Sequence, residues 1–132
     1  MISNPKHGWC DFKLGIFVGT PSYLTDVPVD ILNAFINYHK HGVGVSWFDE
    51  EGSEFTLVIN PYSIFVIEEK DQPVLHDFSE IKLDNLEKEL ITNIESNLNG
   101  WANFIESDDK DDFHAHRAEI KRTLNKLKSY IK

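Results

Sequence analysis

The stretch from Val43 to Glu69 most constrains the fold of this chain. Apolar and polar side chains alternate over Val43–Trp47 and again over Glu54–Asn60, and turn-forming residues occupy positions 49–53 and 60–63. Alternation with a period of two, rich in β-branched and aromatic residues, predicts three successive strands of an antiparallel meander. The third strand opens with the uninterrupted apolar run Ile64–Ile67, which is typical of a strand covered on both faces. The flanking segments must therefore supply cover for the meander.

The segments on either side of the meander predict further elements. Residues 9–19 alternate as one half-exposed strand. A helix is expected from about Pro28 to His41, because proline suits a first turn and Gly42 suits the left-handed position after a helix. Val74–Phe78 predicts a short strand at a sheet edge, where the missing amide of Pro73 costs no ladder bond.

The period changes after Leu83. Apolar residues recur every three or four positions over Leu83–Ile105 and predict a helix with a bend or break at Asn99-Gly100. Asp84 and Glu87 have the spacing of a capping box at its start. A last helix is expected over about Asp111–Ile131.

Together these elements predict an α+β fold. We expect a mostly antiparallel sheet of four to five strands, one crossover helix, and a C-terminal helical hairpin packed on one face. A chain of 132 residues fits a single domain over 1–132. Cys10 has no second cysteine to pair with, and no stretch approaches the roughly 20 apolar residues of a membrane span. With no signal-peptide pattern at its start, the chain is expected to be cytoplasmic and not membrane-bound.

The charge is unevenly distributed. The net charge is −9, and because residues 117–132 carry +5, the first 116 residues carry −14. An acidic body repels nucleic acid and attracts basic proteins. The basic C-terminal stripe has no interleaved aromatic residues on which bases would stack, so no nucleic-acid partner is expected.

Motifs that carry catalysis or bind cofactors do not emerge from the sequence. The histidines at 39 and 41, and those at 114 and 116, are two residues apart, which on a helix separates them by about 200° and prevents a shared metal ion. Cys10 falls on the apolar face of its predicted strand, which favours a structural thiol. No nucleophile elbow, dinucleotide loop or phosphate loop is present. We therefore expect no catalytic, cofactor-binding or metal-binding residues, and a protein that is not an enzyme.

Acidic residues gather where the meander strands end. In an antiparallel meander these ends meet at one edge of the sheet. The alternative to a functional surface is a solvated rim that prevents strand-to-strand aggregation. As a partner-binding surface the rim would use its carboxylates together with two aromatic anchors. The candidate residues are Asp49, Glu50, Glu51, Glu54, Glu68, Glu69, Asp71, Trp47 and Tyr62.

Two stretches, one rich in strands and one helical, resemble a known class of proteins. They are VGVSWFDEEGSEFTLVINPYSIFVI and WANFIESDDKDDFHAHRAEIKRTLNKLKSYI. With the size and acidity of the chain, they resemble the small bacterial immunity proteins of contact-dependent inhibition and other polymorphic toxin systems. The resemblance implies a cognate toxin with a basic surface, often a nuclease, that is inhibited stoichiometrically. It includes no diagnostic motif, so it assigns no role to any residue.

Two other functions remain open. One is a small cytoplasmic enzyme that uses Cys10 or a histidine in a pocket between sheet and helices. The other is a regulatory or scaffold domain that forms homodimers through its C-terminal helices. The sequence leaves the oligomeric state undetermined.

Overall fold

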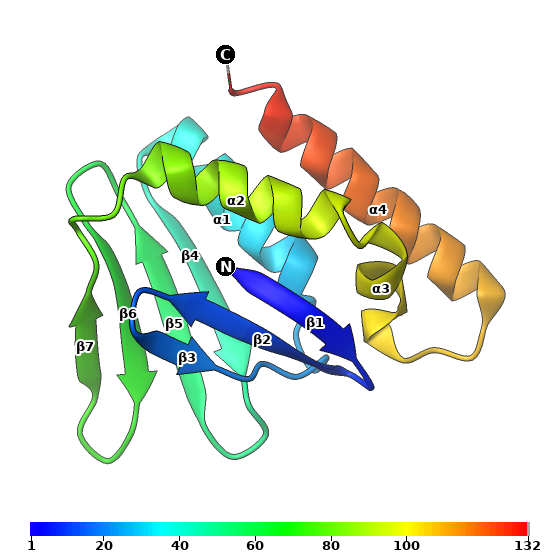
Figure 1. The fold of residues 1–132 in the computed structure, drawn as a ribbon, viewed down its shortest axis with the longest axis horizontal. Coiled ribbons are helices and arrows are strands. Elements are labelled where there is room, and N and C mark those ends of the chain that lie inside the picture. The colour runs from blue at the N-terminus through cyan, green and yellow to red at the C-terminus, as the bar shows by residue number, and fades with distance from the viewer. Residues whose placement is uncertain (132) are drawn as a thin grey trace.

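The computed structural model describes residues 1–131 and has an α+β architecture, as predicted (Figure 1). Its strands are β1 (Ile2–Lys6), β2 (Trp9–Leu14), β3 (Phe17–Gly19), β4 (Gly44–Asp49), β5 (Glu54–Ile59), β6 (Ile64–Glu69) and β7 (Val74–Asp77). Its helices are α1 (Val27–His41), α2 (Leu83–Glu95), α3 (Leu98–Ala102) and α4 (Lys110–Lys128), with a short 3-10 helix, η1 (Asn103–Ile105). The single sheet of four to five strands was wrong, because the strands form two antiparallel sheets ordered β1-β2-β3 and β4-β5-β6-β7.

The three-stranded sheet replaces the one strand predicted for residues 9–19. The chain reverses between β2 and β3, so Lys13 pairs with Val18. Gly15 makes this reversal with a φ of +57°, where a residue without Cβ has little strain. A Cβ at this position would also lie 2.7 Å from the ring of Phe78. The alternation of residues 9–19 runs unbroken through the turn, which explains why the sequence pattern hid the hairpin.

Helix α1 has nearly the predicted extent, but it does not connect the strands that were expected. Pro28 lies in its first turn, and Gly42 closes it at φ +83° with its amide donating to the Tyr38 carbonyl. The helix does not cross over within one sheet, as was expected. It links β3 of the first sheet to β4 of the second.

The second sheet is the predicted meander extended by β7. Each strand pairs antiparallel with the next, and β7 borders β6 alone. The short edge strand after Pro73 is therefore confirmed. The turns that follow β4 and β6 lie at the same end of this sheet, at the bottom of Figure 1.

One face of the four-stranded sheet forms the core. Phe48 and Phe55 stack with ring centroids 4.7 Å apart, and Phe12 of β2 lies 5.0 Å from Phe55. Figure 1 shows β2 and β3 crossing in front of β5 and β6 on this inner face. Helix α1 covers the β4 side so closely that a Cβ on Gly44 would lie 1.8 Å from the Ala34 carbonyl oxygen.

The C-terminal helices differ from the predicted hairpin. The long helix breaks after Glu95, and Asn97 caps α3 by accepting a hydrogen bond from the Gly100 amide. The break thus lies slightly before the predicted Asn99-Gly100. The expected capping box is absent, because Lys82 occupies the N-cap of α2 without a side-chain bond and Glu87 bonds elsewhere.

Helix α4 begins near its predicted start, where the Asp109 side chain accepts a hydrogen bond from the Asp111 amide. It packs mainly against α1 and α3, so a simple antiparallel pair with α2 was wrong. One ion pair, between Lys128 and Glu95 at 2.7 Å, joins α4 to α2. Because α3 and η1 turn the chain between the two long helices, α4 is directed across α1 (Figure 1).

The other face of the four-stranded sheet, here called the outer face, has no covering layer within residues 1–131. The run Ile64–Ile67 was expected to be covered on both faces, but only Ile64 and Val66 are buried. Phe65 and Ile67 point to the outer face and remain partly exposed. Within the described residues, no helix combines the length and the apolar character that crossing a bilayer requires.

Candidate functional site

Three carboxylates form a row across one end of the outer face. The register pairs Asp49 of β4 with Glu54 of β5, and Glu54 with Glu69 of β6. Neighbouring strands lie about 4.8 Å apart, so the row extends over roughly 10 Å. This acid row, Asp49–Glu54–Glu69, lies on one face because the three residues occupy equivalent positions in the pleat.

Behind the acid row, the outer face is largely apolar. Trp47, Thr56, Ile67 and Leu75 form the next row, and Val45, Val58, Phe65 and Asp77 form the row after it. Trp47 is 44% exposed and Leu75 is 62% exposed. A contiguous apolar face of this kind, bounded by charges, is typical of a protein-binding surface.

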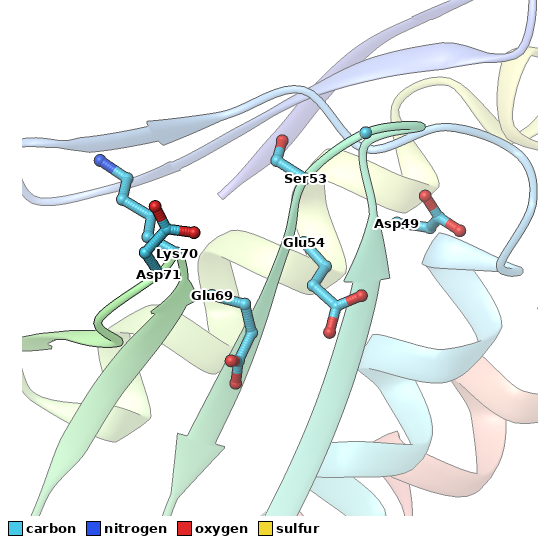
Figure 2. A pocket seen from close by; sticks show the side chains of 7 residues that line it. Asp49, Ser53, Glu54, Glu69, Lys70 and Asp71 are labelled. Carbon is cyan, nitrogen blue, oxygen red and sulfur yellow. The ribbon is translucent and has the colours of Figure 1, made fainter.

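An open cleft of about 540 Å³ lies between the β4–β5 and β6–β7 turns. Figure 2 shows Glu54 and Glu69 projecting side by side in one direction, while Ser53 and Lys70 project in another. The residues lining the cleft are Asp49, Gly52, Ser53, Glu54, Glu69, Lys70 and Asp71. The structure therefore brings four of the seven predicted acidic residues around one cleft.

Two predicted acidic residues in the first turn have local roles instead. Glu50 accepts hydrogen bonds from the Thr20 amide at 2.8 Å and from the Ser53 hydroxyl at 3.0 Å. It thereby holds the segment after β3 against the β4–β5 turn. Glu51 lies in the left-handed region at φ +56°, and its amide donates to Asp49 at 2.7 Å. No local sequence pattern indicates the contact between Glu50 and Thr20, because these two residues are 30 positions apart.

Glu68 lies on the opposite face from its neighbour Glu69. It pairs with Phe55 in the register, on the inner side of the sheet, and its carboxylate lies 3.0 Å from His76 Nε2 and 3.5 Å from Lys70 Nζ. The hydrogen bond from His76 holds the pKa of Glu68 below its ordinary value. Glu68 thus bonds to groups on the inner side of the sheet and does not extend the acid row.

The two predicted aromatic anchors lie far apart. Trp47 is adjacent to the acid row on the outer face. Tyr62, 92% exposed, lies in the β5–β6 turn at the opposite end of the sheet. The six-residue strand β5 separates this turn from the acid row by about 17 Å. Phe48, the neighbour of Trp47 on β4, is fully buried in the core.

A pair of one buried histidine, His116, and one carboxylate, Asp26, was not predicted from the sequence. His116 Nδ1 lies 2.9 Å from the Ala102 carbonyl, and its Nε2 lies 2.9 Å from an Asp26 carboxylate oxygen. Both neighbours are acceptors, so both ring nitrogens donate only when the imidazole is protonated. Burial lowers the pKa of His116, but the hydrogen bonds to Asp26 and Ala102 outweigh it and raise the pKa above 6.5. The pair joins the start of α1 to α3 and α4.

A second histidine adjoins a smaller cavity of about 290 Å³ between the end of α1, the start of α2 and the segment after α4. His39 Nε2 lies 2.6 Å from the buried Glu87 carboxylate, and its ring stacks on Tyr130 at 5.5 Å. Burial raises the pKa of Glu87, against the opposing effect of the His39 hydrogen bond. A histidine thus lies against a buried carboxylate at the wall of this cavity.

The predicted structural role of Cys10 agrees with its placement. The thiol is buried, and burial raises its pKa to about 12, with Asp11 adding to the effect. Among residues 1–131, no group of three or more histidine, cysteine, aspartate or glutamate side chains is placed to hold a metal ion. The outer face itself presents carboxylate and apolar side chains.

Comparisons with known proteins found no family model, no curated protein and no solved structure that matches the chain.

Proposed function

We propose that the chain is a stoichiometric protein-binding inhibitor, whose outer sheet face docks a basic partner protein. The observation that carries this proposal is the acid row beside an uncovered apolar face on the same side of one sheet. In its most concrete form the chain is a cytoplasmic bacterial immunity protein, and the partner is its cognate toxin.

The two parts of the surface have different roles in this proposal. Carboxylates at the rim attract a cationic partner and raise the association rate, most strongly at low salt. Desolvated apolar side chains slow dissociation, among them Trp47 at the β4 end of its row. A basic catalytic cleft, such as that of a nuclease, has the charge that complements the acid row.

Like charges directly opposite each other on neighbouring strands are unfavourable for folding. The chain nevertheless carries Glu54 opposite Glu69. A cationic partner that inserts basic side chains between them removes this repulsion on binding. The acid row therefore supports a partner of opposite charge, beyond serving as a soluble rim.

The experiment starts from the genes that flank the gene for this chain. Their products are co-expressed with the chain, and any complex is tested for Kd and association rate over a series of salt concentrations. Glu54→Lys with Glu69→Lys should lower the association rate at least tenfold at low salt and reduce its salt dependence. Trp47→Ser should raise the dissociation rate with little change in association.

A matched control separates the acid row from net charge. Asp84→Lys with Asp108→Lys adds the same charge at two exposed positions, one in the first turn of α2 and one just before α4. Figure 1 shows the start of α2 and the start of α4 away from the lower end of the sheet, where the turns after β4 and β6 lie. This control should change association far less than the acid-row pair does. Equal effects of both pairs would reduce the proposal to general electrostatic attraction, and a flanking-gene complex unaffected by all variants would contradict it.

A second candidate function is a small enzyme centred on the His39–Glu87 pair. The observation that favours it is a histidine held by a buried carboxylate at the wall of a cavity. His39→Gln should abolish any turnover found in a screen of hydrolase substrates while leaving partner binding unchanged. The outer face remains the better supported site, because the cavity residues include no serine, threonine or cysteine that the histidine could activate.

A further inference from the structure

Strand β7 forms an open edge beside the apolar outer face. Figure 1 shows β7 at the end of the four-stranded sheet, where β6 borders one side and no element of residues 1–131 borders the other. Val74 and Leu75 are exposed although both are apolar. An edge strand of this kind presents unpaired N–H and C=O groups to any chain that approaches it.

The hydrogen-bond phase of β7 can be fixed from one contact. The Phe78 amide donates to the Ile64 carbonyl at 2.7 Å, so residue 78 directs its backbone toward β6. Backbone direction alternates along an antiparallel pair. Leu75 and Asp77 therefore direct their N–H and C=O groups away from β6, and no loop, turn or side chain within residues 1–131 bonds to them.

The side chains of this edge complement a basic segment. Leu75 continues the row that contains Trp47 and Ile67, and Asp77 lies two positions further along the same face. Hydrogen bonds from Ser79 hold the pKa of Asp77 below its ordinary value, so it is ionised at neutral pH. Residues 68–80 contain one lysine, Lys70, and five acidic residues: Glu68, Glu69, Asp71, Asp77 and Glu80.

We propose that an extended basic segment of the partner pairs with β7 as a fifth strand, with an apolar side chain opposite Leu75 and a cationic one opposite Asp77. The inference rests on the proposed function, because it names the part of the partner that the outer face receives. The added strand would satisfy the outward backbone groups and extend the apolar row. Pro73 has no amide, so the ladder is centred on Leu75 and Asp77.

A second copy of this chain is the less suitable occupant. Pairing β7 with itself would bring together two edges that each carry Asp77 and have further acidic residues nearby, among them Glu69, Asp71 and Glu80. Like charges facing each other across a strand pair are destabilising. A basic segment from another protein replaces this repulsion with attraction.

The test uses a synthetic peptide, acetyl-Thr-Lys-Thr-Val-Thr-Lys-Thr-amide, which has its valine and both lysines on one face of a strand. Binding is followed by NMR amide hydrogen exchange on the full chain. At a peptide concentration of about three times Kd, exchange at the Leu75 and Asp77 amides should slow about fourfold. A peptide with glutamate in place of both lysines should give no protection.

Two proline variants locate the contact. Leu75→Pro removes an outward amide that makes no bond within the described residues, so the fold should survive and the protection at Asp77 should be lost. Val45→Pro is the matched control. The Glu50 amide donates to the Ser53 carbonyl, so residue 50 directs its backbone groups toward β5. By alternation along β4, Val45 directs its amide away from β5, at the edge of the sheet opposite β7. Val45→Pro should leave the protection intact.

Asp77→Lys provides a second measure that keeps the backbone unchanged. It should weaken peptide binding about fivefold or more, because it replaces attraction by repulsion in a cross-strand pair. Protection that is absent with the lysine peptide at millimolar concentration, or equal with the glutamate peptide, overturns the inference. Protection that rises with protein concentration alone assigns the edge to a second copy and also overturns it. In either case the acid-row variants still decide the proposed function separately.

Discussion

Glu54 of β5 lies directly opposite Glu69 of β6, and neither carboxylate forms an ion pair within residues 1–131. The nearest lysine in sequence, Lys70, lies beside Glu68 on the other face. Two adjacent like charges without a local cation weaken the sheet that holds them. The stability of the isolated protein should therefore respond to changes in this pair.

Glu69→Gln should stabilise the protein by roughly 0.2–1 kcal/mol at low ionic strength, because it removes a cross-strand repulsion. The gain should shrink in 1 M salt, where the Debye length is about 3 Å. Urea unfolding at both salt concentrations measures the effect. Glu51→Gln, in a turn without a cross-strand partner, is the control. A gain that is the same at both ionic strengths would show that repulsion is not its cause.

His116 should make the free energy of unfolding depend on pH above its ordinary pKa of 6.5. Its folded-state pKa is raised, so its contribution is complete below the ordinary value of 6.5 and is lost as the pH rises through the folded-state value. His116→Ala should cost about 3 kcal/mol at pH 6, because it leaves Asp26 without its buried partner. The difference in unfolding free energy between this variant and the wild type should be smaller at pH 9. His114→Ala, at an exposed position on the same helix, should have little effect at either pH.

The ionisation of Asp30 should change the free energy of unfolding in a lower pH range than that of His116 does. Burial raises its pKa to about 6 from 3.8, with Asp26 and Glu119 adding repulsion. A carboxyl whose folded-state pKa is raised destabilises the fold as it ionises, so its penalty grows between about pH 4 and 6. Asp30→Asn should stabilise the protein by roughly 1 kcal/mol at pH 7.5, after allowance for its partial exposure, and have almost no effect at pH 3.5. The urea midpoint against pH tests this, and an equal gain at both pH values would contradict it.

Local patterns predicted the parts of the fold that depend on neighbouring residues. The period-two alternation predicted β4, β5 and β6. Helix α1 was predicted from the proline in its first turn and the glycine that follows its last residue. The division into two sheets was not predictable in the same way, because it depends on the turn at Gly15 and on contacts such as Phe12 with Phe55, 43 positions away. The antiparallel order did bring the strand ends together, as expected.

The composition of the site was harder to predict than its location. Glu68 and Glu69 are adjacent in sequence but lie on opposite faces, which only the register with β5 distinguishes. Glu50 is held by Thr20 through a contact that no local pattern indicates. His116 did leave a signal, because it lies four residues before Ile120 and eight before Leu124, on the buried face of α4. A histidine in an apolar helical stripe predicts a buried polar contact.

Gly44→Ala should test the close packing of α1 on β4. The new Cβ would lie 1.8 Å from the Ala34 carbonyl oxygen, which is backbone and has little freedom to move. We expect a loss of at least about 3 kcal/mol, at the upper end of the range for overpacked cores. Thermal and urea unfolding measure the loss, with Val45→Ala on the exposed outer face as a mild control. A variant as stable as the wild type would show that helix and strand can separate without cost.

Cys10 should be chemically silent in the folded protein. With a pKa of about 12 and a buried position, its thiolate fraction at pH 8 is about 1,000-fold below that of an unfolded chain, and reagents cannot reach it. Reaction with a chromogenic disulfide at pH 8 should therefore be slower by about three orders of magnitude or more in buffer than in denaturing urea, and its rate should follow the opening of the fold. Because β2 contributes Phe12 to the same core, Gly44→Ala should accelerate the labelling by loosening the whole packing. Rapid stoichiometric labelling of the folded wild type would instead show an accessible thiol, and would return Cys10 to the list of candidate nucleophiles.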